Sequence, residues 1–117
     1  MAITNEIMKG THLGEFEELV LLTVGILSGN AYGITVMDEI EKNTDRRASI
    51  STIHSTLNRL EKKGFIESYV GGASAKRGGR SKRLYRISMA GQHALEKVRL
   101  QREKLWSLMP KNTFGYG

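Results

Sequence analysis

Two neighbouring segments of the sequence carry side chains suited to binding another molecule. The first, residues 49–63, has hydroxyl, amide and guanidinium groups on the face opposite to its apolar residues. Short polar side chains can approach base edges in the major groove of DNA, where asparagine reads adenine and arginine reads guanine. A solvated surface rich in serine and threonine is the alternative interpretation. With His54 beside it, this face is predicted to hold Thr52, Ser55, Thr56, Asn58, Arg59 and Lys62.

The second segment is a glycine-rich loop, residues 71–81, together with the strand expected after it. The loop has no large apolar residue, and no acidic residue occurs between Tyr69 and Ile87. Phosphates are natural partners of such a cationic loop and supply the sequence-independent part of DNA affinity. A solvated loop without a partner is also compatible with this pattern. The net charge of +6 comes from six basic residues here: Lys76, Arg77, Arg80, Lys82, Arg83 and Arg86.

A helix must position the first of these segments. Ser49 or Ser51 can cap its first turn by accepting a backbone N–H bond. Gly64 supplies the left-handed residue that ends many helices. Apolar residues at the spacing of one helix face must turn to the core, and these are Ile53, Leu57 and Leu60.

The rest of residues 14–87 predicts the other elements of a small, mainly helical domain. Helical periodicity indicates one helix over residues 15–27 and another from about residue 31 to residue 43, with a turn between them. We expect a minimal strand at residues 48–50. Strands over residues 65–70 and 83–87 form a hairpin, with Tyr85 and Ile87 on one face. This order of elements is that of a winged helix-turn-helix.

A long last helix is predicted over residues 88–109, with Ser88 as its cap and Pro110 beyond its end. Residues alternately four and three apart form a short coiled-coil-like seam, which favours dimerisation. A helix folded back on its own core is the alternative. Without a partner, the far half of the helix would expose an apolar patch. The expected dimer residues are Leu95, Val98, Arg102, Leu105, Trp106 and Met109.

Composition narrows the class of protein further. A chain of 117 residues with 39% apolar and 26% charged residues is typical of one globular domain. It has no cysteine, and His12, His54 and His93 lack metal-ligand spacing. We therefore expect no enzyme, no metal and no cofactor. Without a bilayer-spanning apolar run or a signal peptide, we expect a cytoplasmic protein that does not enter a membrane.

Four motifs in this chain resemble those of the PadR-like transcriptional regulators, in the short form with a single C-terminal helix. The resemblance covers about residues 14–105. It implies a homodimer that binds a palindromic operator in double-stranded DNA, usually represses transcription and often responds to a small molecule. In chain order the motifs are GEFEELVLLTVGIL, AYGITVMDEIE, STIHSTLNRLEKKGFIES and RGGRSKRLYRISMAGQHAL.

The resemblance also implies roles for parts of the chain. Residues 1–13 are an N-terminal arm, residues 14–87 the winged helix-turn-helix DNA-binding domain, residues 88–109 the dimerisation helix and residues 110–117 a tail. The helix over residues 49–63 would enter the major groove, and the loop would lie along phosphates or the minor groove. Core packing is the alternative for Tyr32. The implied DNA-binding residues are Tyr32, Ser51, Thr52, His54, Ser55, Asn58, Arg59, Lys76, Arg77, Arg80 and Lys82.

Two positions depart from the family pattern. Many relatives have Leu-Tyr-Pro where this chain has Ile53-His54-Ser55. Relatives that bind flat aromatic compounds between subunits use an aromatic residue on the last helix. Arg102 occupies that position here, and Trp106 follows one turn later. A small aromatic effector is therefore an expectation that rests on the family alone.

Two functions account for these features. The first is a homodimeric, sequence-specific DNA-binding regulator, acting as a repressor. The alternative is a winged-helix interaction module whose basic surface binds an acidic partner protein. Binding to random and selected DNA duplexes separates the two, because an interaction module has no preferred duplex.

Overall fold

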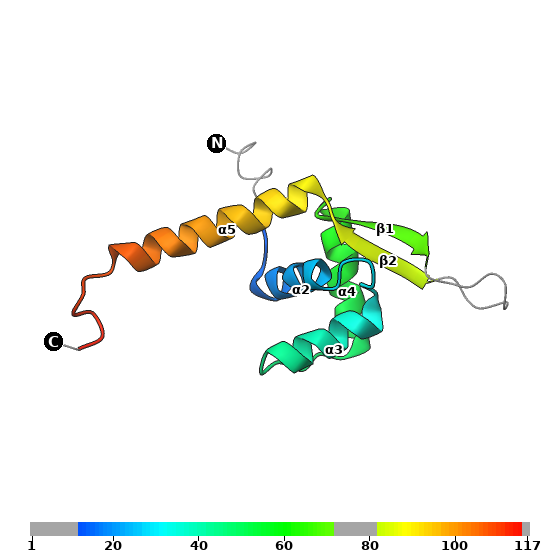
Figure 1. The fold of residues 1–117 in the computed structure, drawn as a ribbon, viewed down its shortest axis with the longest axis horizontal. Helices are drawn as coiled ribbons and strands as arrows, with labels where there is room; N and C mark the ends of the chain where they lie inside the picture. Colours follow the sequence, from blue (N-terminus) through cyan, green and yellow to red (C-terminus); the bar gives the residue numbers. More distant parts are fainter. Residues whose placement is uncertain (1–11, 72–81, 116–117) are drawn as a thin grey trace.

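The protein is described here by a computed structural model of residues 12–71 and 82–115. In this part of the chain, four helices and one antiparallel hairpin form a mainly helical winged helix-turn-helix, as the sequence predicts (Figure 1). The elements in order are α2 (Glu15–Ile26), α3 (Gly33–Asn43), α4 (Ile50–Lys62), β1 (Ile66–Gly71), β2 (Lys82–Ile87) and α5 (Met89–Leu108).

The core lies where α2, α3 and α4 meet, with the hairpin packed beside them. The apolar stripe predicted for α4 is fully buried there, so its opposite face is turned away from the core. Burial of this stripe is the main force that holds α4 to the domain. The buried apolar residues of the cluster are Val20, Leu21, Val24, Ala31, Val36, Ile40, Ile53, Leu57, Leu60, Phe65, Ile66 and Tyr85.

Both predicted ends of α4 are confirmed. The hydroxyl of Ser49 accepts a hydrogen bond from the backbone N–H of Thr52 at 3.1 Å. At the other end Gly64 has a φ of 81°, and the N–H of Phe65 donates to the carbonyl of Leu60 at 2.9 Å. These contacts satisfy backbone groups that a helix leaves without partners. The first and last residues of α4 are therefore fixed by local chemistry.

The hairpin pairs Ile66 with Ile87 and Gly71 with Lys82, and no other strand occurs in the described residues. The minimal strand predicted at residues 48–50 was wrong, because this segment caps and begins α4. The hairpin instead makes a backbone hydrogen bond with the segment between α2 and α3. The N–H of Tyr85 donates to the carbonyl of Ala31 at 2.9 Å. This bond ties β2 to the start of α3.

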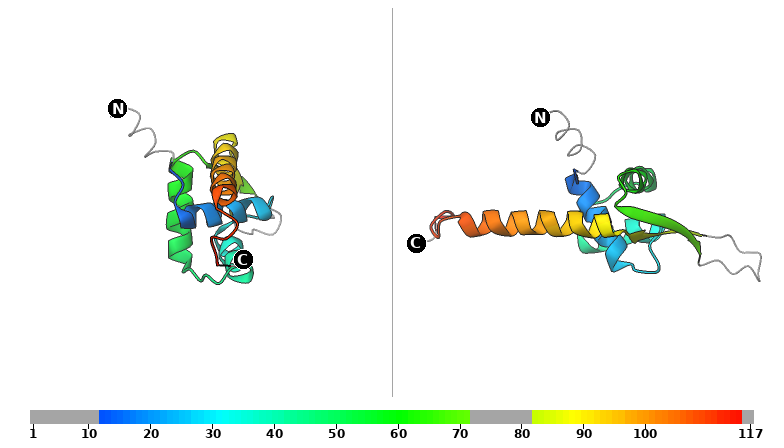
Figure 2. Two further views of the ribbon diagram at one scale, coloured as in Figure 1. Left: turned by 90° about the vertical axis from the view of Figure 1, so that its left-hand side faces the viewer. Right: turned by 90° about the horizontal axis from the view of Figure 1, so that it is seen from above.

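Helix α5 leaves the end of β2, passes α2 and continues beyond the body of the domain (Figures 1 and 2). The free end of α5 and the end of the hairpin at Gly71 and Lys82 point in opposite directions (Figure 2). The predicted cap is confirmed, since the hydroxyl of Ser88 accepts from the N–H of Gly91 at 3.0 Å. Within the described residues, no helix is long and apolar enough to cross a membrane.

Gly91 sits where α5 crosses the start of β1. A Cβ at this position would overlap the carbonyl oxygen of Phe65, which accepts a backbone hydrogen bond from Ser88 at 3.0 Å. That oxygen belongs to the backbone and cannot turn aside as a side chain could. The close approach of α5 to the domain therefore requires glycine at residue 91.

We predict that Gly91→Ala lowers the free energy of unfolding by about 1–3 kcal/mol, the usual cost of overpacking. Gly25→Ala is the matched control, because its Cβ would meet only the flexible Cδ1 of Ile87, at 2.9 Å. Both changes gain the same helix propensity of about 1 kcal/mol. Urea unfolding measures the difference, and equal midpoints for the two variants would contradict this account of the crossing.

Candidate nucleic-acid interface

The outward side of α4 forms an exposed polar face. We call the exposed residues on this side, which are named at the end of this paragraph, the polar face of α4. Near the start of the helix, hydroxyls are already linked to one another. Ser49 Oγ lies 3.1 Å from Ser51 Oγ and donates to Thr52 Oγ1 at 3.0 Å. The members of the polar face are Ser51, Thr52, His54, Ser55 and Asn58.

Thr56 does not belong to this face, and the prediction that it faces outward was wrong. Its side chain is fully buried beside the apolar stripe of α4. The hydroxyl donates to the carbonyl of Thr52 at 2.9 Å and accepts from Arg59 Nη2 at 3.2 Å. Because these partners satisfy the hydroxyl, burial of this threonine costs little. The polar face is therefore narrower than the sequence suggests.

His54 lies against the start of α3. A Cβ on Gly33 would come within 2.7 Å of His54 Cε1 and 2.9 Å of Nε2. Glycine at residue 33 thus makes room for the imidazole, which the sequence alone did not indicate. Gly33 therefore serves the packing of α3 against α4.

Tyr32 and Lys82, both predicted to bind DNA, lie together beside this packing. Lys82 Nζ is 4.5 Å from the centre of the Tyr32 ring and donates to its hydroxyl at 3.3 Å. Tyr32 is the N-cap residue of α3, and Lys82 is the first residue of β2. Lys82 is exposed and Tyr32 is half-buried, and a cation and a phenol at a helix N-terminus form a suitable site for a phosphate group. Their role remains a prediction.

Two basic residues of β2 are neutralised by acids that are distant in the sequence. Arg83 Nη2 lies 2.7 Å from Glu61 Oε1, and Arg86 Nε lies 3.2 Å from Glu67 Oε1. The positive field near the hairpin is therefore weaker than the sequence count implied. The other predicted cations of the loop, Lys76, Arg77 and Arg80, lie outside the described residues.

Arg59 points from α4 toward α2 and contacts Glu17. Its Nε lies 3.3 Å from Glu17 Oε2, while 54% of its side chain stays exposed. Lys63 Nζ lies 2.7 Å from Glu17 Oε1, and the N–H of Gly14 donates to the same oxygen at 2.7 Å. Glu17 itself is buried. The sequence alone did not indicate these partners of Glu17.

The contacts of Glu17 determine its charge. Burial raises the pKa of its carboxyl group, but hydrogen bonds from Lys63 and Gly14, the charge of Lys63 and a hydrogen bond from Arg59 outweigh burial. The pKa of Glu17 therefore lies below its ordinary value of 4.5. At neutral pH the carboxylate is ionised and fully engaged.

The predicted dimer residues divide along α5. Leu95 and Val98 are half-buried on their own domain, and Arg102 Nη2 pairs with Glu18 Oε1 of α2 at 3.2 Å. This half of the helix therefore packs beside its own domain, while the helix as a whole continues straight past it. Farther along, Leu105 and Trp106 are each 65% exposed. Met109 follows directly after α5, as its C-cap residue.

An open groove of about 850 Å³ lies between α2 and α5. We name it the α2–α5 groove. It combines apolar side chains from both helices with charged residues along its edges. The lining residues that matter below are Glu18, Leu22, Leu95, Arg102 and Trp106. Among the residues that the structure describes, no three histidines and acids are grouped closely enough to bind a metal ion.

Comparison with known proteins identifies the family. Residues 21–97 match the model of the transcriptional regulator PadR-like family. The chain belongs to this family, which confirms the resemblance seen in its motifs. A family of transcriptional regulators also agrees with the expectation that the protein is not an enzyme. An uncharacterised protein of Lysinibacillus sphaericus is 31% identical over 87 residues, which are 73% of this chain and 75% of that protein.

Solved structures share the fold. A PadR-like transcription factor from Bacteroides fragilis has a TM-score of 0.66 at 14% identity, over 92% of this chain and 94% of that one. A PadR family regulator from Clostridium difficile has a TM-score of 0.62 at 24% identity, over 80% and 94%. Bacillus subtilis PadR, crystallised with operator DNA, has a TM-score of 0.57 at 15% identity, over 82% and 61%. These likenesses establish the winged-helix fold.

We predict that Glu17→Gln lowers the free energy of unfolding at pH 7 by about 1.5–3 kcal/mol, the usual contribution of hydrogen bonds to charged groups. The pKa of Glu17 is lower in the folded than in the unfolded protein, so its contribution is complete above about pH 4.5. The contribution is lost as the pH falls through the lowered folded value. Urea unfolding should show the two proteins converging below pH 4.5, whereas a constant difference would contradict the ion pairs.

Proposed function

We propose that this protein is a homodimeric transcriptional regulator that binds a palindromic DNA operator in a sequence-specific way and acts as a repressor. The observation that carries the proposal is the exposed polar face of α4, capped at its start and backed by a fully buried stripe. A rigid helix with short polar side chains on its outer face suits the major groove. Membership in a family of transcriptional regulators supports the same conclusion.

Contacts with the DNA backbone come from the residues beside this face. With α4 in the groove, Tyr32 and Lys82 lie where a phosphate can accept hydrogen bonds from the phenol and the ammonium group. The loop residues Lys76, Arg77 and Arg80 extend this contact along the backbone or into the minor groove. Base contacts then provide specificity, and phosphate contacts provide the salt-dependent affinity.

A second copy of the chain supplies the cover that the apolar far end of α5 needs. Leu105 and Trp106 extend beyond the domain, and Leu22 and Ile26 are exposed on α2. Phe114 lies against Trp106, with ring centres 6.3 Å apart, and enlarges this apolar surface. Patches of this kind usually mark an interface. A two-fold dimer formed here would place two copies of α4 on one duplex.

The α2–α5 groove also suits a small aromatic effector that releases the protein from DNA. Leu22 and Trp106 offer apolar and aromatic contacts, and Arg102 lies at the position where relatives have an aromatic residue. A ligand here would lie next to the dimer interface, where it could favour one arrangement of the subunits.

We predict that Asn58→Ala costs about 1–3 kcal/mol of binding free energy at one base position of each half-site, since it removes base contacts. In contrast, Lys82→Ala should weaken binding to all duplexes alike and reduce the salt dependence by about one phosphate contact. Fluorescence anisotropy with a duplex selected from a random pool, its point variants and random DNA measures both effects.

The same measurement separates the proposed function from its alternative. If the wild-type protein binds every duplex with equal affinity, sequence reading is refuted and an interaction module with an acidic partner is favoured. If Asn58→Ala weakens all duplexes alike, the polar face of α4 does not read bases.

We predict that Leu105→Ser shifts the protein from dimer toward monomer by at least about tenfold in dissociation constant, because it places a hydroxyl in a dry interface. Leu100→Ser is the matched control, because Leu100 is similarly exposed but lies about 140° around the same helix from Leu105. Analytical ultracentrifugation over a range of concentrations measures the shift. Equal effects of the two changes would contradict the proposed interface.

A further inference from the structure

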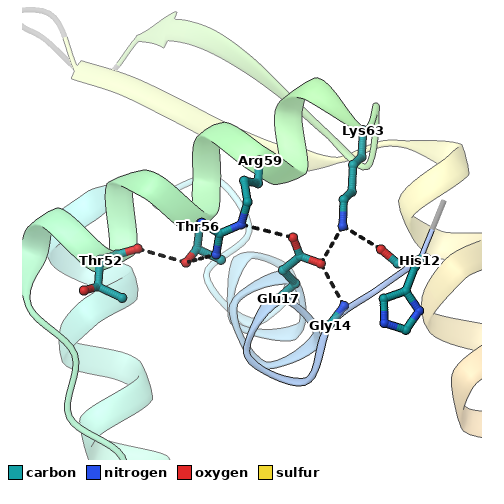
Figure 3. Close-up of polar contacts among 7 residues, drawn as sticks. All are labelled: His12, Gly14, Glu17, Thr52, Thr56, Arg59 and Lys63. Carbon is teal, nitrogen blue, oxygen red and sulfur yellow. Dashed lines mark hydrogen bonds and ion pairs between the residues drawn. The ribbon is translucent and has the colours of Figure 1, made fainter. Parts of the chain in front are cut away.

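A buried carboxylate joins the start of α2 to the last turns of α4 (Figure 3). Both oxygens of Glu17 are engaged. Oε1 accepts from Lys63 Nζ and from the N–H of Gly14, each at 2.7 Å, and Oε2 accepts from Arg59 Nε at 3.3 Å. Lys63 also donates to the carbonyl of His12 at 2.6 Å. One side chain of α2 thus holds Arg59 of α4 and Lys63, the C-cap residue of the same helix.

The two cations lie one helical turn apart on the same side of α4. Because residues four apart in a helix are neighbours on its surface, Arg59 and Lys63 converge on one carboxylate. Two directional contacts along one side of a helix resist rotation about its axis and sliding along it. Apolar burial alone is non-directional and does not resist these movements as strongly.

The orientation of α4 decides which side chains it presents. Side chains project from the helix axis at fixed angles, about 100° apart for consecutive residues. A small rotation of α4 about its axis therefore redirects all of its side chains together. Asn58 precedes Arg59 directly, and a change in the seat of Arg59 would move the Asn58 amide as well. Arg59 is held further by Thr56 Oγ1, at 3.2 Å from its Nη2. The chain from Glu17 through Arg59 to Thr56 links α2 to the middle of α4 (Figure 3).

We propose that Glu17 is a positioning residue for sequence reading. It fixes the rotation of α4 and the conformation of Arg59, and so aims the polar face of α4 at the bases without contacting DNA itself. This inference rests on the proposed function, because it assigns a role to Glu17 in DNA recognition by that face. The inference also changes the role of Arg59 from a DNA contact to a link between α2 and α4. Its Nε and Nη2 groups already donate to Glu17 and Thr56.

The experiment compares Glu17→Gln with Glu15→Gln. Glu15 lies on the same helix, and its ion pair with Arg46 at 2.8 Å is exposed. Both changes remove one negative charge and so raise the general affinity for DNA equally. This gain cancels when the two variants are compared with each other. Anisotropy is measured with the selected duplex and with random DNA at one salt concentration. Glu17→Gln should lose about tenfold or more on the selected duplex relative to Glu15→Gln, and little on random DNA.

A double-mutant cycle tests whether Glu17 acts through α4. Lys63 is outside the proposed set of DNA contacts, so Lys63→Gln affects sequence preference through the seat of α4, and binding to random DNA corrects for its lost positive charge. Because the two residues are direct partners, their effects on the selected duplex should be non-additive. Additive effects would overturn the proposal. If Glu17→Gln fails to fold, Lys63→Gln replaces it, because this change keeps the bonds of Glu17 to Gly14 and Arg59 and disturbs the fold less. Lys63→Gln alone must then lower the preference for the selected duplex over random DNA.

Hydrogen exchange without DNA distinguishes failure of this proposal from failure of the proposed function. If the wild-type protein prefers no duplex, the proposed function falls and the role in sequence reading falls with it. The hydrogen-exchange rates of the backbone amides of α4 then test the remaining claim, that Glu17 holds this helix in place. Faster exchange in Glu17→Gln than in Glu15→Gln supports that claim, and equal rates overturn it. Equal affinities of both variants for the selected duplex likewise refute the proposal.

Discussion

The ionised carboxylate of Glu17 is the directional contact that we propose fixes the rotation of α4, while burial of the apolar stripe holds this helix to the domain. It is buried, yet it is ionised because Lys63, Gly14 and Arg59 surround it with donors. The next residue, Glu18, lies about 100° around α2 and pairs with Arg102 of α5. Two consecutive acids therefore connect α2 to the proposed base-reading helix and to the proposed dimer helix. Helix α2 is the part of the domain that relates one to the other.

The positive charge of the chain is distributed differently in space than in sequence. Arg83 and Arg86 of β2 are neutralised by Glu61 and Glu67, so they add little to an attractive field. Lys82 instead lies on Tyr32 at the start of α3. Within the described residues, the proposed phosphate contact is therefore the pair of Tyr32 and Lys82 beside the polar face of α4. This arrangement suits an anchor that sets the register of α4 on the duplex.

Local patterns in the sequence predicted the helices, the caps at Ser49 and Ser88, and the glycine end of α4, because each depends on neighbouring residues. Contacts between distant residues were not predictable in the same way. The partners of Glu17 follow it by 42 and 46 residues, and the bond between Tyr85 and Ala31 joins two elements. Thr56 was placed outside with the other polar residues opposite the apolar stripe, but its side chain is buried, and its own helix and Arg59 satisfy its hydroxyl. The proposed DNA and dimer contacts remain predictions.

The central claim is that a two-fold dimer aims two copies of the polar face of α4 at one duplex. Selection of bound duplexes from a random pool, followed by sequencing, tests it most directly. The account predicts an inverted repeat whose half-sites are centred about one helical turn, or 10–10.5 base pairs, apart or a multiple of this distance. A pool without a consensus, or a single site without its inverted copy, would contradict it.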